Sequence, residues 1–261
     1  MKLLKLFAKS VALDVAKEMT YKTNFLIKIV ATGLGDVVGP LVTFFIYANT
    51  SGIPGWSLYE FILFQGVATF VIGLGKTFFL LIPYEVTEYV LNGEFDKILV
   101  KPYNALLYMT SMSFMTESIP EIIVGLGLIG YGWYKLQVSV TAVLFLLFFS
   151  IILLGCLVQY ASMIFIAALA FLVIRSEVLI DFFFRLIEFA RYPLNMYTAT
   201  LQTVFVFIFP IAVIGHFPTE ALLRGLAVSR YITIVIPVLV FFSLSLLAWN
   251  FGIKKYSSAG G

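Results

Sequence analysis

The sequence predicts an all-α integral membrane protein, on the basis of its composition, its hydropathy and the length of its apolar stretches. Hydrophobic residues make up 61% of the 261 residues and charged residues only 12%, and the mean hydropathy is +1.03. A water-soluble domain must cover its surface with polar side chains, which this composition does not supply. The apolar stretches reach the roughly 20 residues that a helix needs to cross a bilayer, and they lack the alternating pattern of barrel strands.

Six apolar stretches predict six membrane-spanning helices. They cover residues 25–48, 60–82, 106–133, 140–174, 196–216 and 231–253. The fourth is too long for one perpendicular crossing, so we expect it to tilt or to continue beyond the membrane. Two shorter spans in its place are the alternative.

The distribution of Lys and Arg predicts that both termini are cytoplasmic. An even number of crossings puts both termini on one side, and positive residues near the spans are retained in the cytoplasm. Three basic residues fall on the far side: Lys135, Arg224 and Arg230. Twelve fall on the side of the termini: Lys2, Lys5, Lys9, Lys17, Lys22, Lys97, Lys101, Arg175, Arg185, Arg191, Lys254 and Lys255. Lys28 and Lys76 lie within predicted spans, and we expect their long side chains to extend toward the cytoplasmic face.

Residues 1–24 predict an amphipathic helix that lies along the membrane surface. Leucines and lysines recur there at helical spacing, as in MKLLKLFAKS. The segment lacks the uninterrupted apolar core and the cleavage site of a signal peptide, so we expect it to remain on the protein. A solvated leader that precedes the first span is the alternative. Residues 25–261 would then form the six-span transmembrane domain.

The composition argues against metal, redox and nucleic-acid functions. Cys156 is the only cysteine and His216 the only histidine, so no disulfide within the chain and no metal or haem site is expected. A net charge of +3 is too small to predict nucleic-acid binding. The stretch GLGKT resembles the end of a phosphate-binding loop, but the chain has Phe70 where the full motif needs glycine. We therefore expect no cofactor on this chain, and ATP, if used, on another subunit.

Residues 83–104 predict a structured cytoplasmic loop between the second and third spans. Apolar residues recur at helical spacing before and after Gly93, and Pro102 ends the second run. The pattern predicts two short amphipathic helices hinged at the glycine. Because a simple chain reversal needs only about four to six residues, we expect the apolar face of this loop to bind a partner protein. Helices that rest on lipid headgroups are the alternative.

Three acidic residues lie within predicted spans and away from their ends, where a charge is costly unless it faces protein or water. Asp36 lies between two glycines whose spacing allows a close helix approach. Glu117 and Glu121 are four residues apart, which predicts one shared helix face, and Pro120 would free a backbone carbonyl beside them. All three acids are candidate pathway residues. The alternative is that they are polar groups inside the bundle, one glutamate being neutral and hydrogen-bonded.

Residues 217–230 are too apolar for a free outer loop. They predict a re-entrant or surface-lying helix that is buried in protein before the last span. An ordinary external loop is the alternative.

Four stretches together resemble the permease subunits of the type 2 ATP-binding-cassette (ABC-2) exporter family. They are NGEFDKILVKPYNAL, RYPLNMY, IFPIAVIGHFPTEALLRG and YSSAGG. In the first stretch, the Gly-x-x-Asp, Leu, Pro and Asn pattern of one branch of the family falls on Gly93, Asp96, Leu99, Pro102 and Asn104. Glu117 and Glu121 match no motif of the family.

The resemblance implies six spans, an elbow helix over residues 1–24, a coupling helix in the cytoplasmic loop and an outer re-entrant segment. The residues expected to couple to the ATPase are Gly93, Glu94, Phe95, Asp96, Lys97, Leu99, Lys101, Pro102 and Asn104. Among these we expect Phe95 and Leu99 to be buried in the partner, while the charged residues set the register of docking.

The predicted function is therefore a permease subunit of an ATP-driven exporter in the cell (inner) membrane. The implied partners are two copies of an ATPase subunit, which would bind ATP and Mg, a second permease that is identical or a paralogue, and membrane lipid. The substrate is expected to be a hydrophobic or amphipathic drug, peptide or lipid. The alternative is a proton-coupled secondary transporter that uses Glu117 and Glu121. A membrane enzyme acting on lipids is the least favoured reading, because no activated nucleophile or histidine cluster is present.

Overall fold

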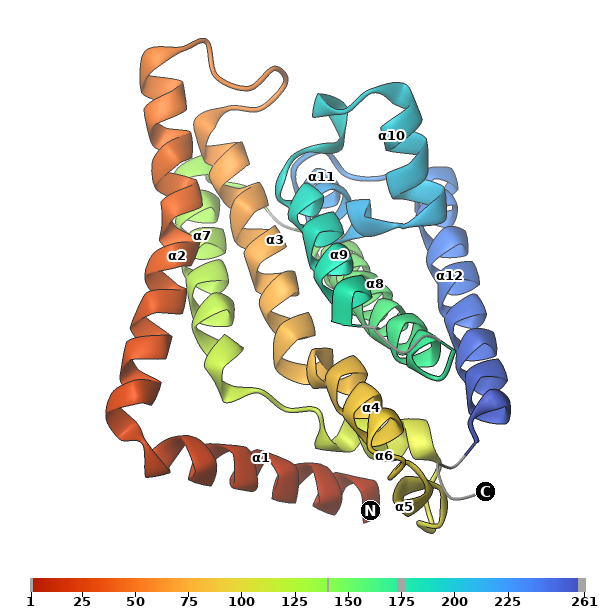
Figure 1. Cartoon of the computed structure of the whole chain (residues 1–261). Coiled ribbons are helices and arrows are strands. Elements are labelled where there is room, and N and C mark those ends of the chain that lie inside the picture. Colours follow the sequence, from red (N-terminus) through yellow and green to blue (C-terminus); the bar gives the residue numbers. More distant parts are fainter. Residues whose placement is uncertain (1, 140, 173–176, 258–261) are drawn as a thin grey trace.

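Long apolar helices connect two ends of the molecule (Figure 1). The structure is a computed structural model that describes residues 2–139, 141–172 and 177–257, and within these ranges the regular elements are all helical. Its α-helices are α1 Lys2–Thr20, α2 Lys22–Asn49, α3 Leu58–Phe79, α4 Leu81–Leu91, α5 Asp96–Leu99, α6 Ala105–Met112, α7 Ile119–Leu136, α8 Ala142–Ala170, α9 Glu177–Glu188, α10 Ala199–Thr203, α11 His216–Arg224 and α12 Val228–Lys255. Short 3₁₀ turns are η1 Thr116–Ser118, η2 Phe189–Arg191, η3 Leu194–Met196 and η5 Ile211–Val213, and Val204–Ile208 is a π-helical turn, η4.

Four helical segments of the described residues are long and apolar enough to cross a membrane. They are Lys22–Asn49, Leu58–Leu91, Ala142–Ala170 and Val228–Lys255. The third predicted span is not one helix, because α6 and α7 are bent by 60° at a break between them. The fourth is one continuous helix, α8, rather than two shorter spans. Both ends of the described chain, the start of α1 and the end of α12, lie at the end of the molecule that contains α5 (Figure 1).

The predicted fifth span, 196–216, is wrong as a continuous helix. The segment is divided among η3, α10, the π-helical η4 and η5, and it ends at the first residue of α11. Pro210 has no backbone N–H to donate, and the backbone at Phe209 leaves the helical region with φ −118° and ψ 88°. The helices α10 and α11 lie instead at the end of the molecule opposite α5 (Figure 1). Of the predicted re-entrant segment 217–230, residues 217–224 belong to α11, which is buried through Phe217 and Leu222.

The helix α9, of 12 residues, lies in the predicted connection between the fourth and fifth spans. It starts near the middle of the molecule, lies beside α8 and leads away from α5 toward α10 (Figure 1). The distribution of basic residues predicts a cytoplasmic position for this connection. The structure shows that its apolar residues Ile180, Phe183 and Ile187 are buried in the core, so that α9 packs as an amphipathic helix.

The helix α1 lies across the α5 end, at a steep angle to α2 (Figure 1). Ser10 donates a hydrogen bond to the carbonyl oxygen of Met112 at 2.9 Å, and the Asp14 carboxylate accepts one from the backbone N–H of Thr116 at 2.9 Å. Both contacts reach the break between α6 and α7. The N-terminal helix is therefore held on the bend of the third span.

The contact between α3 and α7 depends on glycines. A Cβ atom on Gly125 would lie 2.5 Å from the backbone nitrogen of Phe70, and one on Gly66 would lie 2.7 Å from the backbone nitrogen of Ile129. Both distances are shorter than atoms can approach, so these backbones touch only because the side chains are absent. The small-residue contact predicted beside Asp36 is wrong within this chain, because a Cβ on Gly35 would meet nothing within 4 Å.

We predict that Gly125→Ala destabilises the protein, whereas Gly127→Ala on the same helix does not. The added methyl at 125 would collide with the backbone of Phe70, which cannot move like a side chain, while a Cβ at 127 meets nothing within 4 Å. Overpacking of this kind costs about 1–3 kcal/mol. Thermal unfolding of the two purified variants in detergent measures the difference. Equal unfolding temperatures would show that α3 and α7 are not packed as described.

Candidate functional site

The predicted hinge at Gly93 separates two helices. The helix α4 ends at Leu91, Gly93 has a φ of 66°, and the backbone N–H of Glu94 donates to the carbonyl oxygen of Tyr89 at 2.8 Å. The four residues of α5 follow from Asp96. A positive φ is the conformation that glycine adopts without steric cost, so the sharp turn between α4 and α5 requires this residue. The turn brings α5 to the outer limit of the molecule, at the end where the termini lie (Figure 1).

The prediction that Phe95 is buried in a partner is wrong, because Phe95 is buried inside its own chain. Its ring lies 4.9 Å from that of Phe171, 5.5 Å from that of Tyr256 and 6.4 Å from that of Trp249, measured between centroids. Phe171 follows α8, and the other two belong to the end of α12 and the residue after it. Together with the buried Ile98, Phe95 fixes the loop to the ends of two long helices.

The opposite side of the loop is exposed. Val100 is 82% exposed and Leu99 42%, and Leu91 is exposed at the end of α4. Glu94 and Lys97 form an ion pair at 2.6 Å on the surface between them. This combination of apolar and charged side chains leaves a surface that the chain itself does not cover.

The remaining loop residues predicted to couple to the ATPase divide between the two sides. Lys101 donates to the hydroxyl of Tyr108 at 2.5 Å and lies over its ring, and Asn104 caps α6 by accepting from the backbone N–H of Leu107 at 3.2 Å. Asp96 is partly exposed in the first turn of α5, and Pro102 is exposed. Fewer residues are therefore available to contact a partner than the sequence predicts.

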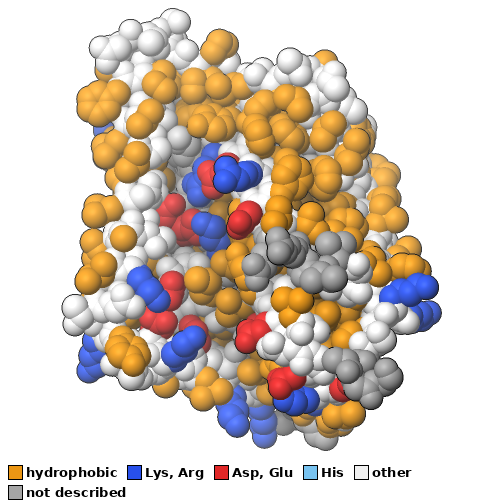
Figure 2. All heavy atoms as spheres, in the orientation of Figure 1, with side chains coloured by type: hydrophobic (Ala, Val, Ile, Leu, Met, Phe, Trp, Pro, Cys, Tyr) orange, Lys and Arg blue, Asp and Glu red, His pale blue; other side chains and the backbone are white. Residues whose placement is uncertain are grey.

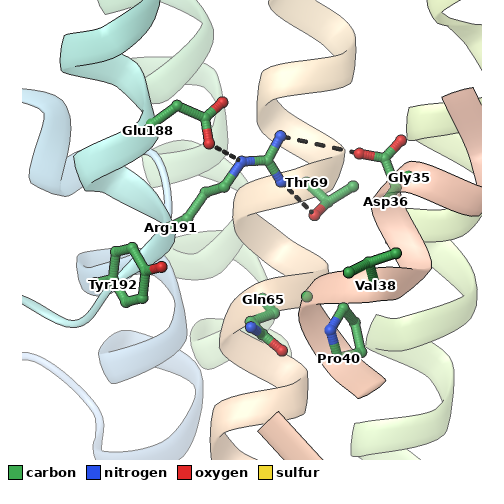
Figure 3. Close-up of a pocket in the computed structure, with 10 residues that line it drawn as sticks. Gly35, Asp36, Val38, Pro40, Gln65, Thr69, Glu188, Arg191 and Tyr192 are labelled. Atoms are coloured by element: carbon green, nitrogen blue, oxygen red, sulfur yellow. Dashed lines mark hydrogen bonds and ion pairs between the residues drawn. The ribbon is translucent and has the colours of Figure 1, made fainter. Parts of the chain in front are cut away.

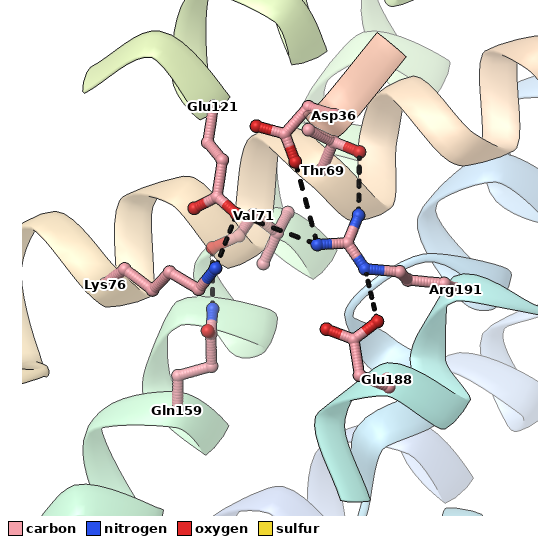
Figure 4. A network of polar contacts seen from close by, with 8 residues as sticks. All are labelled: Asp36, Thr69, Val71, Lys76, Glu121, Gln159, Glu188 and Arg191. Carbon is pink, nitrogen blue, oxygen red and sulfur yellow. Dashed lines mark hydrogen bonds and ion pairs between the residues drawn. The ribbon is translucent and has the colours of Figure 1, made fainter. Parts of the chain in front are cut away.

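A second site is a cluster of charged side chains in the middle of the molecule, centred on Arg191. The guanidinium lies 2.9 Å from Glu188, 3.6 Å from Glu121 and 3.9 Å from Asp36, and it donates to the hydroxyl of Thr69 at 3.3 Å (Figures 3 and 4). Asp36 and Thr69 each lie near the midpoint of their helix, α2 and α3. Four elements, α2, α3, α7 and the α9–η2 segment, therefore meet through one side chain.

Two lysines accompany this cluster. Lys76 pairs with Glu121 at 2.5 Å, and Lys28 pairs with Glu117 and lies 3.9 Å from Glu18. The sequence predicts that both side chains extend toward the cytoplasmic face, and the structure adds that each forms an ion pair. A carboxylate from another element is within reach of each, and a partly buried ammonium group gains more from that partner than from an exposed position.

The structure brings all three predicted acids to one region but not in the predicted way. Glu117 belongs to the 3₁₀ turn η1 and Glu121 to α7, so they do not share the face of one α-helix. Pro120 lies in the first turn of α7, where a missing N–H leaves no helical hydrogen bond broken. Sequence reasoning missed Arg191, which was counted as cytoplasmic. The available signal was its position in RYPLNMY, one of the stretches that resembles the family.

The cluster borders two cavities. One of about 270 Å³ is lined by Asp36, Thr69, Glu188 and Arg191 among others, and one of about 380 Å³ by Lys76, Glu117, Glu121 and Glu188 among others. Acidic and basic side chains gather in a hollow of this face, surrounded by hydrophobic ones (Figure 2). Within residues 2–139, 141–172 and 177–257, no group of three or more His, Cys, Asp and Glu side chains is placed to hold a metal ion.

A comparison with protein families identifies the chain. The model of a family described as "ABC-2 family transporter protein" matches residues 37–260. The chain belongs to this family. The matched region starts in the middle of α2 and ends one residue before the last residue of the sequence. It includes the surface around α5 and the charge cluster except Asp36, and it leaves out α1. No curated protein and no solved structure matches the chain.

Membership makes the chain a permease of a transporter, embedded in a membrane by its apolar helices. Permeases of the ABC-2 family typically work with ATPase subunits. The surface around α5 and the charge cluster are therefore parts of a transport protein.

The end of this ABC-2 permease opposite α5 is held by a third set of contacts. The Trp56 indole N–H donates to the side-chain oxygen of Asn195 at 3.0 Å, and Arg224 donates to the carbonyl oxygen of Gly55 at 2.8 Å. His216 accepts a hydrogen bond from the backbone N–H of Leu194 at 3.3 Å. The loop that follows α2 is thus joined to the segments before and within α11.

We predict that Phe95→Ala lowers the unfolding temperature of the purified permease, whereas Leu99→Ala leaves it unchanged. Phe95 is fully buried among three aromatic rings, and Leu99 is 42% exposed. Removing a buried phenylalanine ring costs roughly 3–5 kcal/mol in soluble cores. Thermal unfolding in detergent checks the contrast between the two variants. If both behave like the unmodified protein, Phe95 does not fix the loop to α8 and α12.

Proposed function

We propose that the chain is the permease subunit of an ATP-driven exporter and forms half of a translocation pathway. ATP and Mg would be bound by two copies of a separate ATPase subunit, and a second permease, identical or a paralogue, would supply the other half. Two facts support the proposal: the chain belongs to the ABC-2 family, and permeases of this family typically work with ATPase subunits. The chain itself has no complete phosphate-binding motif, since Phe70 stands where the motif needs glycine.

The observation that favours coupling through α5 is the two-sided character of the loop. Phe95 and Ile98 are buried in the permease, while Leu99 and Val100 are exposed on the other side. A short segment that is fixed to its own protein and presents apolar side chains outward fits a docking element, because burying such side chains in a partner is favourable. The ion pair of Glu94 with Lys97 offers charges that would orient the docking.

The same geometry provides a route for movement. Closure of the ATPase dimer would displace α5, and Phe95 would transmit the displacement to Phe171, Trp249 and Tyr256 at the ends of α8 and α12. Packed side chains transmit such displacements because protein interiors are dense. The loop is also continuous with α3 through α4, since Leu58–Leu91 counts as one helical segment. Movement of the loop would therefore reach the charge cluster directly.

In this proposal the protein lies in the cell (inner) membrane with both termini cytoplasmic. The α5 end, which contains the ends of the described chain, would face the ATPase in the cytoplasm. The substrate would be a hydrophobic or amphipathic drug, peptide or lipid, because the bundle interior is apolar and aromatic apart from its charged cluster.

The test is a pair of substitutions on the exposed side of the loop. In the complex reconstituted with its ATPase, we expect Leu99→Asp with Val100→Asp to reduce transport more than tenfold, because two charges would face an apolar docking surface. Asp96→Lys should act in the same direction through the register of docking. The control is Tyr134→Asp, an equally exposed aromatic at the end of α7 remote from α5, which should leave transport unchanged. Full transport by both loop variants would remove the assignment.

The rival function, proton-coupled transport through Glu117 and Glu121, is tested separately. Each glutamate lies beside a lysine, Lys28 or Lys76, and a proton carrier must lose and regain its charge during each cycle. We expect export to continue when the proton gradient is dissipated at constant ATP. Export that stops under this condition, with ATP hydrolysis intact, would support the rival.

A further inference from the structure

The two cavities beside the charge cluster form a furrow between α2 and α9, with α3 at its base, which we call the α2–α9 furrow. It is defined by Asp36, Thr69, Lys76, Glu117, Glu121 and Glu188, which line one or the other cavity. Glu188 lines both, so the cavities adjoin. Known ligand sites have volumes of about 300–1,000 Å³. The cavity of about 380 Å³ falls in this range, and the cavity of about 270 Å³ is slightly smaller.

The sign of charge that the furrow would accept follows from its hydrogen bonds. The donors of Arg191 already face Glu188, Glu121, Asp36 and Thr69, and the ammonium group of Lys76 faces Glu121. The cations are therefore engaged, which leaves little to attract an anion.

The acids, by contrast, have unused capacity. The carboxylate oxygens Oδ2 of Asp36 and Oε2 of Glu121 are buried and accept no hydrogen bond from any residue that the structure describes. Their side chains are only 8% and 3% exposed. A buried carboxylate oxygen without a donor costs free energy that a bound donor would restore.

The charge balance points the same way. Asp36, Glu121 and Glu188 surround Arg191 and Lys76, which leaves one negative charge in excess. The neighbouring group of Glu117, Glu18 and Lys28 adds no positive excess. A ligand that carries a positive charge would balance the furrow.

We propose that the α2–α9 furrow binds the protonated amino group of an amphipathic amine, with Asp36 Oδ2 and Glu121 Oε2 as hydrogen-bond acceptors. The amine would be the head of the exported substrate, so that this inference rests on the proposed function and narrows its substrate class. Phe184, Ile187 and Leu80 line the second cavity and offer an apolar surface for the tail.

The direct test is binding to the full chain in lipid nanodiscs, without ATPase or nucleotide. Three probes share a ten-carbon tail: decylamine has a charge and donors, decyltrimethylammonium has a charge without donors, and decanol has a donor without charge. We expect decylamine to bind most tightly and decyltrimethylammonium to bind with at least about tenfold lower affinity. Decanol should show no measurable binding. Microscale binding titration measures all three affinities. Charge-assisted hydrogen bonds account for this order.

The variants are Asp36→Asn and Glu121→Gln, which keep the shape of the side chain and remove its charge. Each should weaken decylamine binding about tenfold or more, and decanol should again show no measurable binding. The control Glu220→Gln removes a carboxylate that pairs with Arg230 at 3.0 Å, in α11 outside the furrow, and should change nothing. Because Glu121→Gln deprives Lys76 of its partner and can impair folding, Asp36→Asn decides if that variant does not fold.

The outcomes separate the two proposals. Equal binding of all three probes, or decylamine binding that Asp36→Asn and Glu121→Gln do not change, would show that the cluster is a structural ion-pair network only. That result would leave the exporter proposal intact, since ATP-dependent transport is measured with the reconstituted complex. Selective amine binding by a chain that recruits no ATPase would uphold the furrow and remove the exporter proposal instead.

Discussion

The guanidinium of Arg191 organises the middle of this permease, because an ion that is largely withdrawn from water needs partners of opposite charge. It draws carboxylates from α2 and α7 and from its own segment toward one point, with the hydroxyl of Thr69 from α3 (Figure 4). Much of the surface of α2 is exposed in the single chain, so its contact with the rest depends strongly on a few polar groups. Removing the guanidinium would leave the largely buried Asp36 carboxylate without its ion-pair partner.

The helix α3 connects this cluster to the loop that contains α5. One face of α3 packs closely against α7, with Gly66 of α3 and Gly125 of α7 at the points of backbone contact. This contact leaves the two helices little freedom to slide past each other. Another face presents Thr69 and Lys76 to the cluster. Because α3 continues into α4, the segment Leu58–Leu91 extends from the loop to the cluster as a single element. In the proposed mechanism, a displacement at the hinge after α4 would therefore reach the cluster through one helical segment.

Local features of the fold followed from the sequence, and contacts between distant segments did not. The turn at Gly93 was predictable because a glycine between two apolar runs specifies its own backbone conformation. The burial of Phe95 was not, since its ring partners lie some 75 to 160 positions later, at Phe171, Trp249 and Tyr256. Hydropathy also predicted one continuous crossing over 196–216, because it does not register the break in the helix at Phe209 and Pro210.

The charged residues of α9 indicate what lies beside this helix in the assembled transporter. Asp181, Arg185 and Glu188 recur at helical spacing on the side of α9 that is exposed in the single chain, opposite the buried Ile180 and Phe183. Charges at such positions are expensive against lipid tails and inexpensive against water or another protein. A helix of this kind fits beside an aqueous pathway or a second subunit. This argument supports the proposed pairing with a second permease, and it explains why a hydropathy rule, which detects helices that face lipid, does not detect α9.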